Sequence, residues 1–148
     1  MKHYTSIEQS RKLIELGLKP ETADMCYEYD QYADTKYCHI PTIKMKEFEY
    51  KGSIPCWSVG ALLEALPKGI DKWDDRDRSR KIYELNLFRS YYHCCSYTFG
   101  PALKLENHDQ LLGYGGDTWI EAVYNIALKL AERGWLTCKR EIGNIVIA

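Results

Sequence analysis

The residues best suited to chemistry are two sets of adjacent cysteines and histidines, Cys38-His39 and His93-Cys94-Cys95. Cysteine sulfur and histidine nitrogen are common zinc ligands, and a histidine can activate a cysteine as a nucleophile. However, neighbouring side chains on a strand point to opposite faces, and the chain has no C-x-x-C or H-x₃₋₅-H pair. The spacing therefore predicts reduced structural thiols, with no metal ligand, no cofactor site and no catalytic residue.

Acidic residues and glycines elsewhere give equally weak signs of catalysis. Glu21 and Asp24 share one face of a short helix, but acidic residues in a first helical turn stabilise the helix dipole without any reaction. His108-Asp109 lies in a sequence typical of a turn. Gly113–Gly116 precedes a helix, yet it matches no phosphate-binding motif and Asp117 would repel a phosphate. We therefore expect no nucleotide site.

Tyrosines and charges are concentrated in two segments of opposite sign. Residues 19–35 contain five acidic residues and one lysine, whereas residues 76–89 contain five basic and two acidic residues. Tyrosine beside charge is common at protein interfaces. The predicted interaction surface is therefore Tyr27, Tyr29, Tyr32, Arg76, Arg78, Arg80, Arg89, Tyr91 and Tyr92.

The composition is that of an ordinary globular protein. The 148 residues are 45% hydrophobic and 28% charged, and 20 Lys+Arg against 21 Asp+Glu give a net charge of −1. These values exclude wholesale disorder, collagen and coiled coil, and they argue against indiscriminate nucleic-acid binding. The sequence has no apolar stretch of the roughly 20 residues that span a bilayer and no signal-peptide core. We expect a cytoplasmic protein with no membrane partner; the resemblance described below implies that the cell is a bacterial host.

Three helices are predicted, each beginning at a capping residue. They cover 6–16 after Thr5, 58–66 from Ser58 and 118–133 from Thr118. Thr5 with Glu8, and Thr118 with Glu121, have the spacing of a capping box.

Alternation of apolar and polar residues predicts strands between these helices. They cover 25–30, 37–43, 47–50, 82–97, 102–106, 110–114 and 142–147. The charged segment 68–81 is expected to be a mobile loop that Trp73 attaches to the body of the protein. Helices placed around a block of strands predict a single α+β domain over residues 1–148, with an antiparallel sheet packed by about three helices.

Several motifs occur together in one group of known sequences. They are Thr5-Ser6-Ile7-Glu8-Gln9-Ser10, Leu13-Ile14-Glu15-Leu16-Gly17-Leu18, Glu21-Thr22-Ala23-Asp24-Met25, Ile54-Pro55-Cys56-Trp57-Ser58 with Leu62-Leu63, and Gly116-Asp117-Thr118 with Glu121-Ala122. Over most of its length the chain resembles short uncharacterised proteins encoded by phages, prophages and mobile elements of gut bacteria. The resemblance implies a small cytosolic accessory protein and transfers no catalytic residue, because the group has no assigned reaction.

The sequence as a whole favours a non-enzymatic accessory protein whose partner is another protein or a second copy of the chain. One alternative is a nucleic-acid-binding module in which the basic segment contacts phosphates and Tyr91 and Tyr92 stack on bases. A third hypothesis is a small hydrolase or metal protein built on the Cys/His sets.

Overall fold

A computed structural model describes residues 2–43, 52–99, 109–136 and 141–148. Within them the helices are α1 (Ile7–Glu15), the short 3-10 helix η1 (Pro20–Thr22), α2 (Val59–Ala65) and α3 (Trp119–Glu132). The strands are β1 (Met25–Tyr27), β2 (Thr42–Ile43), β3 (Ile54–Cys56), β4 (Gly69–Asp74), β5 (Ser79–Arg89), β6 (His93–Phe99), β7 (Asp109–Gly116), β8 (Glu141–Ile142) and β9 (Ile145–Ile147). These elements confirm the predicted α+β class.

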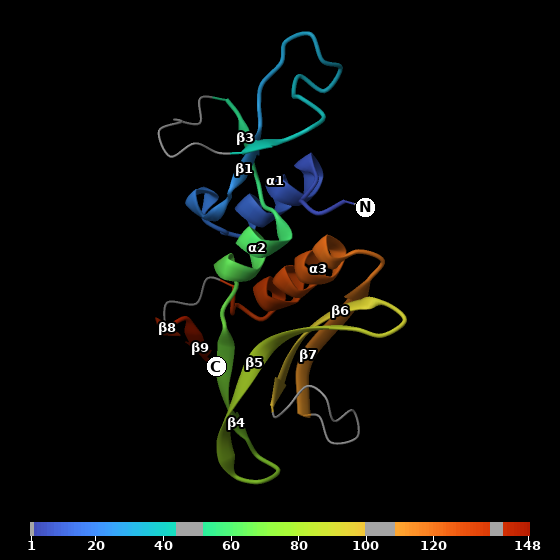
Figure 1. Cartoon of the computed structure of the whole chain (residues 1–148). Coiled ribbons are helices and arrows are strands. Elements are labelled where there is room, and N and C mark those ends of the chain that lie inside the picture. The colour runs from blue at the N-terminus through green and yellow to red at the C-terminus, as the bar shows by residue number, and fades with distance from the viewer. Residues whose placement is uncertain (1, 44–51, 100–108, 137–140) are drawn as a thin grey trace.

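The strands form two sheets with helices between them. The smaller sheet has the order β2-β1-β3 and the larger has the order β7-β6-β5-β4-β9-β8. Neighbours are antiparallel except β4 and β9, which run parallel. In Figure 1, α1 lies beside the small sheet, and α2 and α3 separate it from the large sheet. Because α3 packs on β6 and β7, the main core lies between this helix and one face of the large sheet.

The helix predictions are confirmed within one residue at each end. Ser58 begins α2, and its Oγ accepts a hydrogen bond from the Ala61 N–H at 3.2 Å. Thr118 begins α3, and its Oγ1 accepts one from the Glu121 N–H at 3.3 Å. Local capping chemistry therefore sets both starts. No helix in the described part of the chain has the length and apolarity needed to cross a membrane.

The capping residue predicted for α1 is wrong by one position. Ser6 is the cap, because its Oγ accepts from the Gln9 N–H at 3.1 Å and the Gln9 Oε1 accepts from the Ser6 N–H at 2.9 Å. Thr5 is instead completely buried. Its Oγ1 accepts from the Trp57 N–H at 3.0 Å and lies 2.7 Å from the Ser10 Oγ. Thr5 thus joins α1 to the segment between β3 and α2.

The charged segment 68–81 forms a hairpin, so the prediction of a loop there is wrong. β4 pairs with the first half of β5 from Gly69 opposite Glu84 to Asp74 opposite Ser79. Charged residues on the two strands form ion pairs diagonally across the pairing, such as the Arg80 Nε with the Asp71 Oδ1 at 3.0 Å. Opposite charges on neighbouring strands stabilise their pairing, so a polar sequence can form this hairpin.

The long strand predicted over 82–97 is two strands. β5 ends at Arg89 and β6 begins at His93, and the Ser90 N–H donates to the Tyr92 carbonyl at 3.0 Å in the turn between them. Apart from Ser90, the turn contains none of the residues that normally mark one (glycine, proline, asparagine, aspartate and serine), so the sequence pattern gives little sign of it.

The remaining strand predictions differ mainly in length. The strand predicted over 110–114 is confirmed within β7, and 142–147 contains β9 after a turn at Gly143 and Asn144. β1 covers only the start of 25–30, and β2 only the end of 37–43. The predicted strands 47–50 and 102–106 lie outside the described residues.

Candidate functional site

The tyrosines predicted to form one surface lie in three different environments. Tyr27 is 3% exposed, and its hydroxyl donates to the Thr5 carbonyl at 2.8 Å, so its assignment to a surface is wrong. Burial also raises the pKa of Tyr27. The periodicity placed Tyr27 on one face of a strand but could not show that this face packs against α1. Tyr29 and Tyr32 are exposed in the loop after β1.

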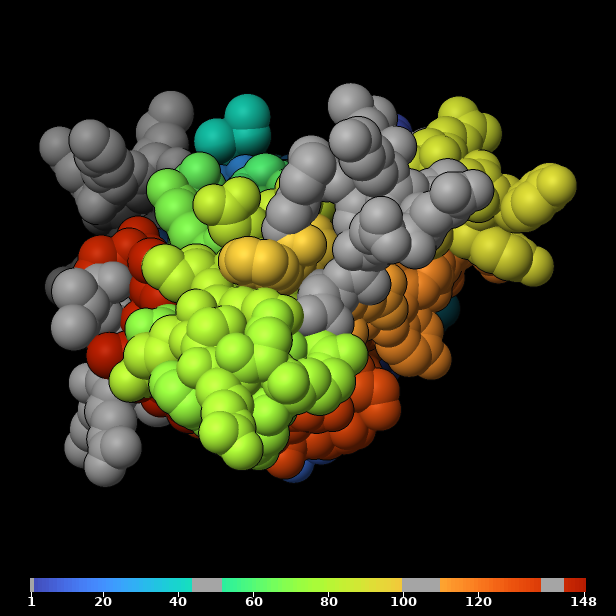
Figure 2. Space-filling model, turned by 90° about the horizontal axis from the view of Figure 1, so that it is seen from below, coloured from blue at the N-terminus to red at the C-terminus, as the bar shows by residue number. Residues whose placement is uncertain are grey.

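Tyr91 and Tyr92 lie in the turn between β5 and β6. Tyr91 is 99% exposed, and Figure 2 shows this yellow turn projecting from one side of the molecule. In Figure 1 the loop that carries Tyr29 and Tyr32 lies at the top, away from this turn. The acidic and the tyrosine-bearing basic segments therefore do not form a continuous surface.

The basic hairpin is largely neutralised by its own aspartates. Arg76 donates to both carboxylate oxygens of Asp74, from Nε at 3.1 Å and from Nη2 at 2.9 Å. Arg80 pairs with Asp71, as described above. Arg78 and Arg89 are exposed and have no ion-pair partner among the described residues. Phosphate binding depends on cations that can neutralise it, and fewer are available here than the sequence suggested.

A buried lysine closes this hairpin. The Lys81 Nζ lies 2.9 Å from the Asp74 Oδ2 and 2.7 Å from the Asp77 Oδ2, and 5.1 Å from the centre of the Phe99 ring. The hydrogen bonds from Arg76, and then from Lys81, hold the pKa of Asp74 well below its usual range. Asp74 thus stays charged and paired, and its contacts with Arg76 and Lys81 hold the hairpin together.

The Cys/His sets do not come together. Cys38 lies in the loop after β1, whereas His93 lies in the large sheet with its ring 4.6 Å from that of Trp119. Cys95 is fully buried and burial raises its pKa to about 12, while its neighbour Cys94 is half-buried on the opposite face. In the described part of the chain, no three histidine, cysteine or acidic side chains are grouped to hold a metal.

The acidic and glycine-rich candidates have structural roles. Asp24 accepts from the N–H of Ser58 at 2.9 Å and from its hydroxyl at 2.6 Å, which fixes the start of α2. The glycines 113–116 belong to β7, not to a loop. A Cβ on Gly116 would lie 2.8 Å from the Ala122 nitrogen, so this glycine allows α3 to approach the strand. His108 lies outside the described residues.

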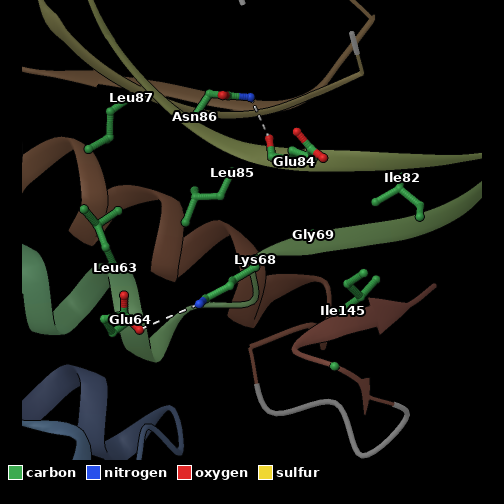
Figure 3. Close-up of a pocket in the computed structure, with 11 residues that line it drawn as sticks. Leu63, Glu64, Lys68, Gly69, Ile82, Glu84, Leu85, Asn86, Leu87 and Ile145 are labelled. Carbon is green, nitrogen blue, oxygen red and sulfur yellow. Dashed lines mark hydrogen bonds and ion pairs between the residues drawn. The ribbon is translucent and has the colours of Figure 1, made fainter. Parts of the chain in front are cut away.

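A groove of about 580 Å³ opens beside β5, at the point where the chain passes from α2 into β4 (Figure 3). Its lining residues are Leu63, Glu64, Lys68, Gly69, Ile82, Glu84, Leu85, Asn86, Leu87, Gly143 and Ile145. Leu63 from α2 and both Leu85 and Leu87 from β5 point into the space between the two elements. Leu87 is 40% exposed, so the groove presents apolar side chains to solvent.

Beside this groove, one edge of β5 has no strand partner in the part of the chain that the structure describes. On the edge of β5 that faces β4, the last hydrogen bond joins the Leu85 N–H to the Lys68 carbonyl at 3.0 Å. Beyond Leu85, no described strand pairs with this edge of β5. Alternate residues of a strand point their backbone groups to opposite edges. The Ser90 N–H bonds toward β6, so the N–H and C=O of Leu87 and the N–H of Arg89 point to the open edge.

The side chains near this edge follow the same alternation. In the pairing of β5 with β6, Leu85 lies opposite Tyr97 and Leu87 opposite Cys95, both buried in the core with α3. Leu85 and Leu87 therefore lie on the α3 face of the sheet. Asn86 lies on the outer face, where its Nδ2 donates to the Thr98 Oγ1 at 2.8 Å.

Sequence reasoning missed this site because its parts are remote in the chain. The alternation of β5 was visible, but a strand reads the same whether its edge is paired or open. The one local sign is Pro67, which ends α2 and lies just before β4. Because proline has no backbone N–H to pair with a neighbouring strand, it indicates that β4 does not extend along all of β5. Comparison with protein-family models, with curated proteins and with solved structures found no match for this chain.

Proposed function

We propose that this chain is a non-enzymatic protein-binding protein that holds an extended segment of its partner along the open edge of β5. The observation that carries the proposal is that the backbone groups of Leu87 and Arg89 that face this edge have no strand partner among the described residues and lie beside an apolar groove. Added strands bind through such backbone groups, and pockets for alternate side chains give specificity. We propose further that this binding serves an accessory role in a phage or mobile element, as the resemblance noted in the sequence implies.

The chemistry of the edge predicts modest affinity. Each backbone hydrogen bond formed at the open edge contributes about 0.5–1.5 kcal/mol. One aliphatic side chain buried against Leu63 and Leu87 adds about 1.5–3 kcal/mol. Because ordering a flexible peptide opposes these gains, we expect dissociation constants in the micromolar to millimolar range, on the order of 10⁻⁵ to 10⁻³ M.

Nuclear magnetic resonance of the ¹⁵N-labelled chain tests the proposal. The probe is a pool of hexapeptides in which leucine, isoleucine or valine alternates with threonine. The amide signals of Leu87 and Arg89 should shift most, and they should saturate together. If the pool leaves both signals unmoved at millimolar concentration, the proposal is wrong.

Variants distinguish edge pairing from general stickiness. Leu87→Pro removes the open N–H and keeps an apolar side chain, and proline is tolerated where a strand's N–H faces solvent. Leu63→Asp places a charge in the groove. Both should lower affinity at least tenfold, whereas the control Leu87→Met should change it less than twofold. A dimer of the chain that Leu87→Pro dissociates would make a second copy the occupant and overturn the choice of partner.

A further inference from the structure

The chain's own backbone closes one end of the open edge. Lys68 lies opposite Leu85, and its N–H donates to the Asn144 carbonyl at 2.9 Å, so it is already engaged. From Gly69 onward β4 occupies the position beside β5. A bound segment that lies opposite Leu87 therefore meets Lys68 about two residues further on.

We infer that the groove takes the C-terminal end of the partner chain, an inference that rests on the function proposed above. A segment that prolongs the line of β4 and runs antiparallel to β5, as β4 does, points its carboxyl end toward Lys68. An internal segment would have to turn sharply out of the sheet at this point. A chain end simply stops there.

Leu87 sets the requirements of a segment that binds in this antiparallel direction. Leu87 presents both its N–H and its C=O, and in an antiparallel pair two opposed residues exchange both hydrogen bonds. The ligand residue opposite Leu87 is then the penultimate one, so it must have an N–H and cannot be proline. Its side chain lies on the same face as that of Leu87, toward Leu63, which favours leucine, isoleucine or valine.

Lys68 is the residue of the groove that would bind the C-terminal carboxylate of the partner segment. Among the described residues that line the groove, Lys68 is the only cation, and Glu64 and Glu84 are its acidic neighbours. Its Nζ lies 3.9 Å from the Glu64 Oε2, and both side chains are more than half exposed (59% and 79%). Exposed pairs of this kind are weak, so a ligand carboxylate can compete for the ammonium. The acidic neighbours oppose that carboxylate, which makes Lys68 necessary.

The test compares two peptides that differ in one group. Acetyl-Thr-Val-Thr-Leu-Thr is prepared with a free carboxylate and as the carboxamide, and each is titrated into the ¹⁵N-labelled chain. We expect the acid to bind about threefold more tightly than the amide, as one exposed ion pair allows. Lys68→Gln should remove this difference without changing the affinity of the amide. Glu64→Gln should enlarge the difference, because it removes a competing carboxylate.

The outcomes separate this inference from the proposal beneath it. If acid and amide shift the Leu87 and Arg89 signals with equal affinity, carboxylate recognition is wrong and edge binding stands. Equal weakening of both peptides by Lys68→Gln also overturns the inference, because Lys68 would then act on the groove's shape. If neither peptide shifts these signals, both ideas fail.

Discussion

Replacing Thr5 by valine should destabilise the protein far more than loss of a helix cap does. The substitution keeps the shape of the side chain and removes its hydroxyl. In the native structure that hydroxyl is completely buried, accepts from the Trp57 N–H at 3.0 Å and lies 2.7 Å from the Ser10 Oγ. Thr5→Val therefore leaves a buried backbone N–H and a buried hydroxyl without their partner.

The expected loss follows from these two groups. An orphaned buried donor or acceptor costs about 1–3 kcal/mol. Burying an additional methyl group in place of the hydroxyl returns about 0.8 kcal/mol. We therefore expect the free energy of unfolding to fall by about 3 kcal/mol. Removal of an ordinary capping threonine costs typically about 1 kcal/mol, so the two roles differ measurably.

Urea unfolding followed by tryptophan fluorescence measures the change, with Ser10→Ala as the matched variant. Ser10→Ala removes one partner of Thr5 but keeps its bond to Trp57, so it should cost about 1 kcal/mol. The double variant should lose less than both single losses together, because the shared bond is broken only once. A loss of 1 kcal/mol or less in Thr5→Val, with additive behaviour, would refute the buried network.

Four further predictions concern other buried groups. Tyr97→Phe removes a 2.6 Å hydrogen bond to the Pro67 carbonyl and should lower the free energy of unfolding in urea by about 1–3 kcal/mol. Because the pKa of Asp74 is lowered in the folded state, its ionised carboxylate stabilises the protein above its ordinary pKa of 3.8, and this stabilisation is lost as the pH falls below that value. The thermal unfolding temperature of Asp74→Asn should therefore fall less at acid pH than that of the native protein. Burial raises the pKa of Cys95 from 9.0 to about 12, so the stability of the folded state should fall as the pH rises through this interval. In Cys95→Ala the thermal unfolding temperature should therefore decrease less over the same pH range. Mass spectrometry after iodoacetamide treatment at pH 8 should find Cys94 modified before Cys95, and equal rates would contradict the burial.

The parts of the fold that were predictable depend on neighbours in the sequence. Ser58 and Thr118 cap their helices through groups three residues away, so the starts of α2 and α3 could be predicted from the sequence. For α1 the sequence Thr5-Ser6 offers two capping residues, and the choice depends on Trp57, which is distant in the sequence. Burial of Thr5 could not be inferred from its local pattern.

Pairing between strands limited the rest of the prediction. The charges of β4 and β5 indicated a loop because each was judged alone, whereas Asp71 and Arg80 lie on facing strands and neutralise each other. The groove forms because Leu63 of α2 and Leu87 of β5 both line the space beside the start of β4. How these residues come together depends on the pairing of the strands and not on the local sequence. Exposure of an apolar side chain is a property of that arrangement and not of its residue type.

The position of β9 has a consequence for the chain while it is being made. β9 pairs in parallel with β4, from Gly69 opposite Ile145 to Asp71 opposite Ile147, and it pairs antiparallel with β8 on its other side. During synthesis the β4–β5 hairpin can form as soon as it leaves the ribosome, but its outer edge has to wait for the residues of β9. Until then β4 presents an uncovered strand edge, which is a known site of misassembly. The uncovered edge of β4 is therefore open to pairing with other chains during the interval before β9 covers it.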